Sequence, residues 1–501
     1  MKSIRRIFSI AALALCALSM SYATTYFVNA SAGNNANSGT VSGTAFKTIT
    51  HAISVATSTD VINVAAGTYN TALGEVFPLV MVSGVTLTGS AGAATTIIDA
   101  TGDSSRVFIC DGNSASTIIQ GFTITGGFSI NYSSAGQVAK GGGIYITNNS
   151  QTIIQNNIIT RNTARGYDFF MAGAGAINGG SCYGGGVFVN SGSPTIQNNV
   201  ISYNVAKGGG GQDFRGGWSG NGSSGGDAEG GGIHAGFGGS GVSTLINNTF
   251  YGNQAIGGRG GSSNSLNAGN GGNATAGALD AGSDAIVRNN IFCNDSAIAG
   301  IHGGGAGGTN GTETDGALTS YTAGNLSYNL YYNNSAATNP NGATLGSNNI
   351  LSDPLFISAT NFHLQAASPA RKAGTVAGAP TTDFDGTART NPPAIGAYDG
   401  SVPSSVDVGE IVAPKVFKLA QNYPNPFNPS TTIEYSLAAA EVVSLRVYDV
   451  LGREVATLVN AREESGNHAV RLDGSELSSG NYYYIFRAGS VMLTKQMLLL
   501  K

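Results

Sequence analysis

Apolar and asparagine positions recur along the chain in one template, apolar-x-x-Asn-x-apolar-x-x-Asn. Five copies follow it closely, and a degenerate earlier copy begins at Ile119. The first Asn of the five copies lies at Asn157, Asn199, Asn248, Asn290 and Asn329. A period of about 40 to 50 residues is typical of repeat proteins, in which each copy forms one structural unit. We therefore predict a solenoid over this part of the chain.

A second short unit precedes most copies of the template. It reads GGGIYITNN (141–149), GGGVFVNSG (184–192), GGGIHAGFG (230–238) and, more weakly, AGALDAG (276–282). Such β-branched and aromatic runs between Gly and Asn turns predict strands of a few residues. Strands this short cannot bury their apolar face alone, so successive copies must stack and share one core.

The Asn that recurs in each copy has a structural explanation. Asn tolerates a left-handed backbone at a bend better than other residues with a side chain. With strands about 4.8 Å apart, its amide can bond to the equivalent Asn of the next coil. We expect Asn157, Asn199, Asn248, Asn290 and Asn329 to form a structural ladder rather than a ligand site.

These repeats resemble the parallel β-helix repeats of pectate-lyase-like proteins and, more loosely, the repeats of polymorphic outer-membrane proteins. Residues 25–70 resemble the opening cap of secreted β-helix proteins, with a short helix at about residues 48–56. Residues 352–356, 361–375 and 383–400 resemble their closing segment, sometimes called a choice-of-anchor domain. The resemblance implies a right-handed parallel β-helix solenoid. With the small antiparallel β-sandwich expected after it, the predicted fold is all-β.

The sandwich is expected after Gly400, where the composition changes to a Pro, Ser and Val linker. Alternating strands at 443–450 and 482–486 lie between Gly turns. The motifs NYPNPFNPSTTIEYSL (422–437), VYDVLGREV (447–455), SGNYYYIF (479–486) and KQMLLLK (495–501) resemble the C-terminal sorting domain of the type IX secretion system. That resemblance implies a Bacteroidetes-like bacterium, export, and a protein that is released or attached to the cell surface after removal of the tail. A plain Ig-like binding module is the alternative.

The N-terminus has the pattern of a signal peptide. Lys2, Arg5 and Arg6 precede an apolar stretch that ends near Met20, and small residues surround the expected cleavage after Ala23. This stretch is too short for a membrane span, and no later run reaches about 18 apolar residues.

We accordingly expect six regions. They are a signal peptide (1–23), a cap with the first coils (24–100), β-helix repeats with Gly-rich loops (101–335), a closing segment (336–400), a linker (401–415) and the sorting domain (416–501).

Charge and cysteine content narrow the functional classes. There are 24 Lys and Arg against 28 Asp and Glu residues, and three of the basic residues lie in the leader, so nucleic acid is not an expected partner. Cys110, Cys182 and Cys293 are far apart and odd in number, which favours small buried thiols over a disulfide framework.

Four long Gly-rich stretches follow successive template copies, at about 164–183, 206–229, 255–275 and 297–315. If each copy is one coil, these stretches leave from the same corner as stacked loops, where solenoids often bind ligands. Alternatively, part of each stretch forms a second coil, which the strand-like GAGAINGG (173–180) would favour.

The same stretches contain the candidate ligand-binding residues. Aromatic and charged side chains together are the groups that recognise sugars. The candidates are Asp168, Asp213, Arg215, Trp218, Asp227 and Glu229. The alternative is that Trp218 only holds a loop against the wall.

Two functional hypotheses remain. The favoured one is a non-catalytic glycan-binding or adhesin-like surface protein without a cofactor or metal, whose partners are the type IX machinery and a polysaccharide or other surface glycan. The rival is a polysaccharide lyase, with Ca²⁺ if so, or a glycoside hydrolase with a divergent site. We find no clear catalytic constellation, and we expect His234 and His302 to have turn or surface roles. Fold alone does not separate the two hypotheses.

Overall fold

The computed structural model describes residues 23–130, 138–168, 177–213, 221–236, 241–263, 267–282, 285–319, 326–335, 347–399, 417–422, 425, 427, 429–437, 439–463, 466–489 and 491–500. The predicted signal peptide, apart from Ala23, and the predicted linker lie outside these residues. The chain divides into two compact units, Met1–Leu351 with Ala377–Pro380, and Ser352–Val376 with Thr381–Lys501.

The first unit is a right-handed parallel β-helix with three walls. Strands that are 20 to 50 residues apart in the sequence pair in parallel, because each coil places the same short segments on top of those of the previous coil. The first wall has the order β1 (Thr25–Val28), β2 (Val61–Val64), β5 (Thr86–Gly89), β8 (Ile118–Gln120), β13 (Ile153–Gln155), β18 (Thr195–Gln197), β23 (Thr244–Ile246), β28 (Ile286–Arg288) and β33 (Leu326–Ser327). The second wall has the order β3 (Gly67–Asn70), β6 (Thr96–Asp99), β9 (Thr123–Thr125), β14 (Ile158–Thr160), β19 (Val200–Ser202), β24 (Thr249–Tyr251), β29 (Ile291–Cys293), β34 (Leu330–Tyr332) and β35 (Ile350–Leu351). The third wall has the order β4 (Leu79–Val80), β7 (Phe108–Asp111), β12 (Ile144–Thr147), β17 (Val187–Val189), β22 (Ile233–His234), β27 (Leu279–Asp280) and β32 (Leu318–Thr319).

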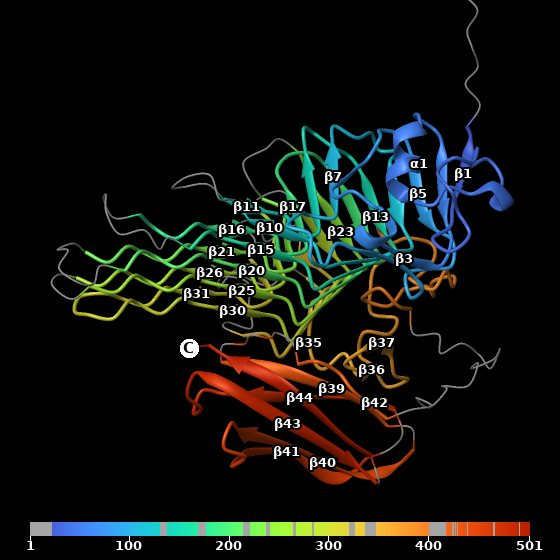
Figure 1. Cartoon of the computed structure of the whole chain (residues 1–501). Coiled ribbons are helices and arrows are strands. Elements are labelled where there is room, and N and C mark those ends of the chain that lie inside the picture. The colour runs from blue at the N-terminus through green and yellow to red at the C-terminus, as the bar shows by residue number, and fades with distance from the viewer. Residues whose placement is uncertain are drawn as a thin grey trace, which may run out of the picture. The chain divides into compact units, whose positions relative to one another are not determined.

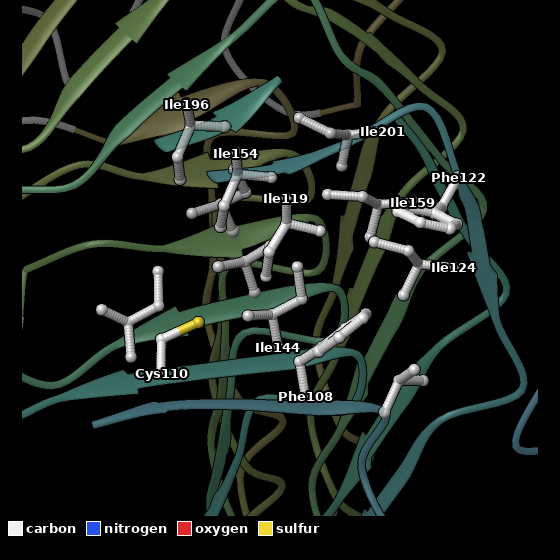
Figure 2. Packing of buried hydrophobic residues seen from close by; sticks show 14 of the residues in the cluster. Phe108, Cys110, Ile119, Phe122, Ile124, Ile144, Ile154, Ile159, Ile196 and Ile201 are labelled. Atoms are coloured by element: carbon white, nitrogen blue, oxygen red, sulfur yellow. The ribbon is translucent and has the colours of Figure 1, made fainter. Parts of the chain in front are cut away.

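The walls enclose one continuous apolar core, as the template predicts. The first apolar residue of the template lies on the first wall, where Ile119, Ile154 and Ile196 are fully buried and occupy successive coils. The second apolar residue lies on the second wall and packs toward the same interior (Figure 2). The GGG units supply the third wall, so that all three strands of a coil contribute to the core.

Asparagine ladders connect the coils at both bends of the template. At the first bend, the backbone N–H of each Asn donates to Oδ1 of the Asn in the next coil at 2.9–3.0 Å. The Nδ2 atoms donate to a backbone carbonyl of the previous coil, for example from Asn199 to Ile154. The members are Asn157, Asn199, Asn248, Asn290 and Asn329. The left-handed backbone conformation predicted for the ladder Asn is found instead at the residue before it, as in Asn156 with a φ of 55°. The ladder Asn itself, such as Asn157, is fully buried.

The second ladder contains one carboxylate. It consists of Asn162, Asn204, Asn253, Asp295 and Asn334. Asp295 Oδ1 accepts from the backbone N and the Nδ2 of Asn253 at 2.8 and 2.9 Å. Burial raises the pKa of Asp295 from its ordinary value of 3.8 to about 8, although its hydrogen bonds lower it.

The Gly-rich stretches leave the helix at one corner, between the second and third walls. Each runs outward and returns, and the successive stretches stack into two five-stranded parallel layers that project together from the walls (Figure 1). The outgoing layer contains β10 (Phe128–Ile130), β15 (Thr163–Arg165), β20 (Val205–Lys207), β25 (Gln254–Ile256) and β30 (Ser296–Ile298). The returning layer contains β11 (Ala139–Lys140), β16 (Cys182–Tyr183), β21 (Ala228–Glu229), β26 (Ala274–Thr275) and β31 (Glu313–Thr314). We call the two layers together the fin.

Small side chains hold the two layers of the fin together near the walls. A buried cluster of seven alanines and Cys182 alternates between the layers. Since Ala and Cys are short, the two backbones approach closely, and the stretches form paired segments instead of a second coil around the core.

The N-terminal cap agrees with the expected helix. Helix α1 (Ile49–Val55) begins after Thr48, whose side chain accepts from the N–H of His51, and ends before Ala56. Glu75 reaches its first turn from far along the chain, where Oε1 accepts from the Ile49 N–H at 2.6 Å and Oε2 from the Thr50 N–H at 2.8 Å. The 3-10 turns η1 (Ser42–Thr44) and η2 (Thr71–Leu73) flank this helix in sequence.

Cys110, Cys182 and Cys293 of the described residues are buried. They lie in apolar surroundings within the strands β7, β16 and β29. Burial raises the pKa of the Cys110 thiol to about 12, which keeps it in the unreactive protonated form.

Residues 352–399 contain one antiparallel pair, β36 (Phe356–Ser358) and β37 (Asn361–Leu364), followed by loops. Three residues of the predicted closing motif organise these loops. Asp383 Oδ2 accepts from the N–H of Asp399, and Asp399 in turn accepts from the N–H of Ala394 and from buried Arg389.

The C-terminal domain consists of antiparallel sheets, as predicted. One sheet has the order β38 (Lys418–Leu419), β39 (Ser430–Leu437) and β42 (Gly466–Asp473), and the other has β41 (Glu454–Glu463), β40 (Glu441–Asp449), β43 (Gly480–Ala488) and β44 (Val491–Leu499). Alternate residues of these strands form a separate apolar core. Asn422 of the NYPNPF motif lies in this domain, where its N–H donates to the Tyr484 hydroxyl at 2.8 Å.

Candidate functional site

The returning segments of the fin follow a three-residue period. A residue with a side chain recurs at every third position, and the two positions between are mostly Gly, as in NGSSGGD (221–227) and NAGNGGN (267–273). Three residues per turn is the period of the polyproline II helix, which forms no internal hydrogen bonds and therefore offers its backbone groups to neighbours.

The three positions of each turn point in three directions. One backbone N–H donates within its own layer, as from Gly225 to the Asn270 carbonyl at 2.8 Å. The next donates across to the other layer, as from Gly226 to the Gly209 carbonyl at 2.9 Å. The third residue carries the outward side chain. The fin is therefore a backbone hydrogen-bond lattice with side chains on its outer faces.

Glycine is required where the layers meet. A Cβ added to Gly208 of the outgoing layer would lie 2.0 Å from the Gly226 carbonyl oxygen, and one added to Gly179 of the returning layer would lie 1.9 Å from the Gly209 carbonyl oxygen. Neither partner is a flexible side chain, so no larger residue fits without separating the layers.

The outward side chains of the returning layer form columns of amides and hydroxyls. In one column the N–H of Asn273 donates to Asp227 Oδ1 at 2.7 Å, and the N–H of Thr312 donates to Asn273 Oδ1 at 2.9 Å. Each side chain thus caps the outward N–H of the next coil. We call this surface the polar face; it consists of Asn178, Ser181, Asn221, Ser224, Asp227, Asn267, Asn270, Asn273, Thr309 and Thr312.

The candidate ligand-binding residues are divided between the two layers. Asp168 and Asp213 belong to outgoing segments, where Asp168 Oδ1 accepts from the Gly210 N–H and Asp213 Oδ1 from the Ser262 N–H. Asp168 also pairs with Arg165. Asp227 belongs to the polar face. Arg215 and Trp218 lie outside the described residues.

Glu229 belongs to a different group of side chains at the root of the fin. His234 Nε2 lies 3.2 Å from Glu229 Oε2 and 3.4 Å from Asp280 Oδ2. One ligand atom from each of the three residues lies within 4.8 Å of the others. We call Glu229, His234 and Asp280 the root cluster.

Strand register explains why these residues meet. His234 and Asp280 are paired neighbours on β22 and β27 of the third wall. Glu229 lies on β21 of the returning layer, just before the chain enters β22. The preceding coils carry aromatic residues in the equivalent positions, Phe188 beside His234 and Tyr183 beside Glu229. Their ring centroids lie 5.2 and 5.0 Å from the His234 ring.

Burial shapes the electrostatics of the root cluster. The side chains of His234 and Asp280 are 3% and 6% exposed, whereas that of Glu229 is 31% exposed. Burial raises the pKa of Asp280; the charge of His234 opposes that rise and the charge of Glu229 adds to it. The cluster can hold a shared proton or a cation.

The expectation of a turn or surface role is wrong for His234, which is buried in a strand. His302 is exposed. Sequence reasoning missed the root cluster, yet the aligned units GGGVFV, GGGIHA and AGALDA place His234 and Asp280 where Phe188 stands. The available indication was that two ionisable residues, His234 and Asp280, follow the aromatic Tyr145 and Phe188 at the same position of successive units.

None of the helices in the described part of the chain has the length and hydropathy of a membrane span. No curated protein matches this chain. Among solved structures, "Crystal structure of pectate lyase Pel9A" is similar with 15% identity and a TM-score of 0.32, covering 76% of this chain and 97% of that chain. "Rhamnogalacturonan lyase" is similar with 14% identity and a TM-score of 0.28, covering 62% of this chain and 69% of that chain.

Two family profiles match the sequence. Residues 421–500 match the "Secretion system C-terminal sorting domain", in agreement with the type IX motifs and the antiparallel domain described above. The protein is therefore exported by the type IX secretion machinery. Residues 31–352, which span the cap, the walls and the fin, match the second profile. Because that match covers well over half of the 501 residues, the chain belongs to the family described as "Protein of unknown function (DUF1565)".

Proposed function

We propose that this exported β-helix protein is a non-catalytic, adhesin-like surface protein that binds a glycan through its fin. After removal of the sorting domain, the rest of the chain is attached to the outer cell surface or released. The polar face is the observation that carries this proposal, because it repeats amides and hydroxyls in two directions over an exposed surface.

The polar face suits a polymeric ligand. Its side chains recur every three residues along a segment, about 9 Å at 3.1 Å per residue, and about 4.8 Å apart between coils. A polysaccharide also repeats its hydroxyl groups along its length, so one chain can contact several columns. Asn offers both an acceptor and donors to hydroxyl groups.

Preorganisation also favours binding. Asn270 Oδ1 accepts from the Thr309 N–H at 3.0 Å, and Asn273 Oδ1 accepts from both the N–H and the hydroxyl of Thr312 at 2.9 and 2.8 Å. These bonds hold the side chains in place before a ligand arrives, so little rotamer entropy is lost on binding.

The acidic candidates have a structural contribution within this proposal. Asp168 and Asp213 fix the N–H groups of neighbouring coils on the outgoing layer, and Asp227 does so on the polar face. We further propose that Trp218 supplies ring stacking against a sugar and Arg215 a charged contact, as their side-chain chemistry allows.

The test is retention of the full chain on a panel of immobilised acidic and neutral polysaccharides. The double variant Asn270→Ala with Asn273→Ala should lose retention at least about tenfold, and Trp218→Ala should weaken it. Gln254→Ala, which removes an amide from the outgoing layer, is the matched control and should retain binding. Unchanged retention in the double variant with an unchanged melting temperature would rule out the polar face.

The root cluster favours a second candidate function, a polysaccharide lyase or glycoside hydrolase. Two carboxylates beside an imidazole are groups that could transfer protons, although His234 and Asp280 are nearly inaccessible to a polymer. Unsaturated or reducing ends appearing on incubation with the same panel, and disappearing in Glu229→Gln, would establish the enzyme and refute the non-catalytic proposal.

A further inference from the structure

We infer that the root cluster binds a divalent transition-metal ion, through one imidazole nitrogen of His234 and one carboxylate oxygen each of Glu229 and Asp280. The ion would join the returning layer of the fin to the third wall. This inference does not depend on the proposal that the polar face binds a glycan.

The spacing of the ligand atoms fits such an ion. Tetrahedral ligands at about 2.1 Å from a metal lie about 3.4 Å from one another. His234 Nε2 lies 3.2 Å from Glu229 Oε2 and 3.4 Å from Asp280 Oδ2. The three atoms could therefore surround one ion with little movement.

The ligand types select the class of metal. Calcium and magnesium take oxygen ligands almost exclusively. A set of one imidazole and two carboxylates is instead typical of zinc and of other first-row divalent ions. The site thus differs in chemistry from the all-carboxylate calcium sites expected of a polysaccharide lyase.

Charge balance supports a dication. Asp280 and His234 are almost completely buried, and Glu229 lies beside them. Two carboxylates this close together in a largely buried place repel one another. An imidazolium neutralises one of the two charges, whereas a divalent ion with a neutral imidazole neutralises both.

The site is open on one side. The Glu229 side chain is 31% exposed, so an ion can enter there and complete its coordination with water. On the other sides, Phe188 and Tyr183 of the preceding coil flank the imidazole and hold its ring in orientation. Aromatic walls with one solvated side would make the ion slow to exchange.

The test uses the full chain, purified with a chelator and then dialysed against Zn²⁺. We expect about one tightly held zinc per chain and a rise in melting temperature that the chelator reverses. His234→Gln and Asp280→Asn should each weaken zinc binding at least about 10- to 100-fold. His302→Gln removes an exposed histidine of the fin and should leave the stoichiometry unchanged.

Glu229→Gln covers the case in which the buried variants fail to fold, because its side chain lies at the solvated rim. It should also lose zinc while its circular dichroism spectrum stays that of the wild type. Absence of a tightly held zinc in the wild type would overturn the inference. Equal affinity in the wild type and in folded Glu229→Gln would overturn it too, since the three residues would then form only an ion pair.

Discussion

Replacement of Asp295 by Asn should stabilise the β-helix, and by more at higher pH. Asp295 is the carboxylate of the second ladder, whose other members are Asn. In each neighbouring coil the ladder Nδ2 donates to a carbonyl of the previous coil, for example from Asn253 to Ile201 at 2.8 Å. By the same register, an amide at position 295 would face the carbonyl of Phe250.

The magnitude follows from the pKa. In the unfolded chain the Asp295 carboxyl ionises near 3.8, and in the folded chain near 8. A raised carboxyl pKa means that stability is fully present below about pH 4 and is lost as the pH rises toward 8. At 1.36 kcal/mol per pKa unit, the loss between those pKa values amounts to about 4 kcal/mol at pH 7. Asn does not ionise, and its new hydrogen bond of about 1 kcal/mol is offset by the loss of the Oδ2 acceptor of the Cys293 N–H.

The assay is urea or thermal unfolding of the full chain, compared at about pH 4 and at pH 7 to 8. The free energy of unfolding of Asp295→Asn should differ little from that of the wild type at about pH 4 and should exceed it by several kcal/mol at pH 7 to 8. Asn204→Asp puts a carboxylate into the ladder one coil away from Asn253. This variant should be less stable than the wild type, and the loss should grow as the pH rises from 4 to 8.

A pH-independent difference between Asp295→Asn and the wild type would refute this reasoning. It would mean that Asp295 ionises equally easily in the folded and unfolded chains, so that the ladder tolerates a charge without cost. A destabilised Asp295→Asn at pH 8 would refute the assignment of its ladder partners as well.

Three further outcomes are expected. Gly258→Ala should destabilise the first unit by at least about 2 kcal/mol, because its Cβ would lie 1.9 Å from the Gly209 carbonyl oxygen of the neighbouring outgoing segment and 2.8 Å from the Gly226 nitrogen of the facing layer. Gly43→Ala has nothing within 4 Å of the added atom and should leave the melting temperature unchanged; equal effects would contradict the lattice. Glu75→Gln should lower the free energy of unfolding, measured in urea, by about 1–3 kcal/mol. The amide replaces one of the two carboxylate oxygens that accept from the first turn of helix α1, such as the Oε2 that accepts from Thr50, by a donor. An unchanged midpoint would show that water satisfies the N–H groups of this turn. The Cys110 thiol, whose pKa burial raises to about 12, should resist a thiol reagent at about pH 8 until the chain is denatured, and rapid labelling of the folded protein would contradict its burial.

The walls of the β-helix could be predicted from the sequence because their determinants are local. Apolar residues at fixed distances from an Asn, such as Ile154 before Asn157, specify which side chains face the core. The short helix near residues 48–56 was predicted from the resemblance of residues 25–70 to the opening cap of secreted β-helix proteins, and the structure shows that Thr48 caps it. Each of these features depends on a few neighbouring residues.

The fin was harder to predict, although its period is present in the sequence. The Gly-rich stretches were interpreted as loops or a second coil, because Gly is usually a breaker of regular structure. Only the spacing of Asn267, Asn270 and Asn273 by three residues indicates a regular helix of another kind. Its hydrogen bonds join segments that are not neighbours in the sequence, for example 17 residues apart between Gly226 and Gly209 and 45 between Gly225 and Asn270, so no local propensity indicates them.

The root cluster was missed for a related reason. Glu229 and His234 are five residues apart, but Asp280 joins them only through the pairing of β22 with β27. A residue-by-residue reading sees an isolated His among glycines. Alignment of the units by register, position against position, would have brought His234 and Asp280 into one column.

The three-residue geometry of the fin also bears on how this surface can change during evolution. Two positions of every turn make contacts between backbones. A substitution there destabilises the fin, whichever ligand the fin binds. The third position, exemplified by Asn270, meets no neighbouring backbone atom so closely and needs only a side chain that accepts from an N–H of the next coil. We therefore expect sequence changes in related proteins to concentrate at these positions, among residues that keep this hydrogen bond, so that binding specificity can change while the scaffold is retained.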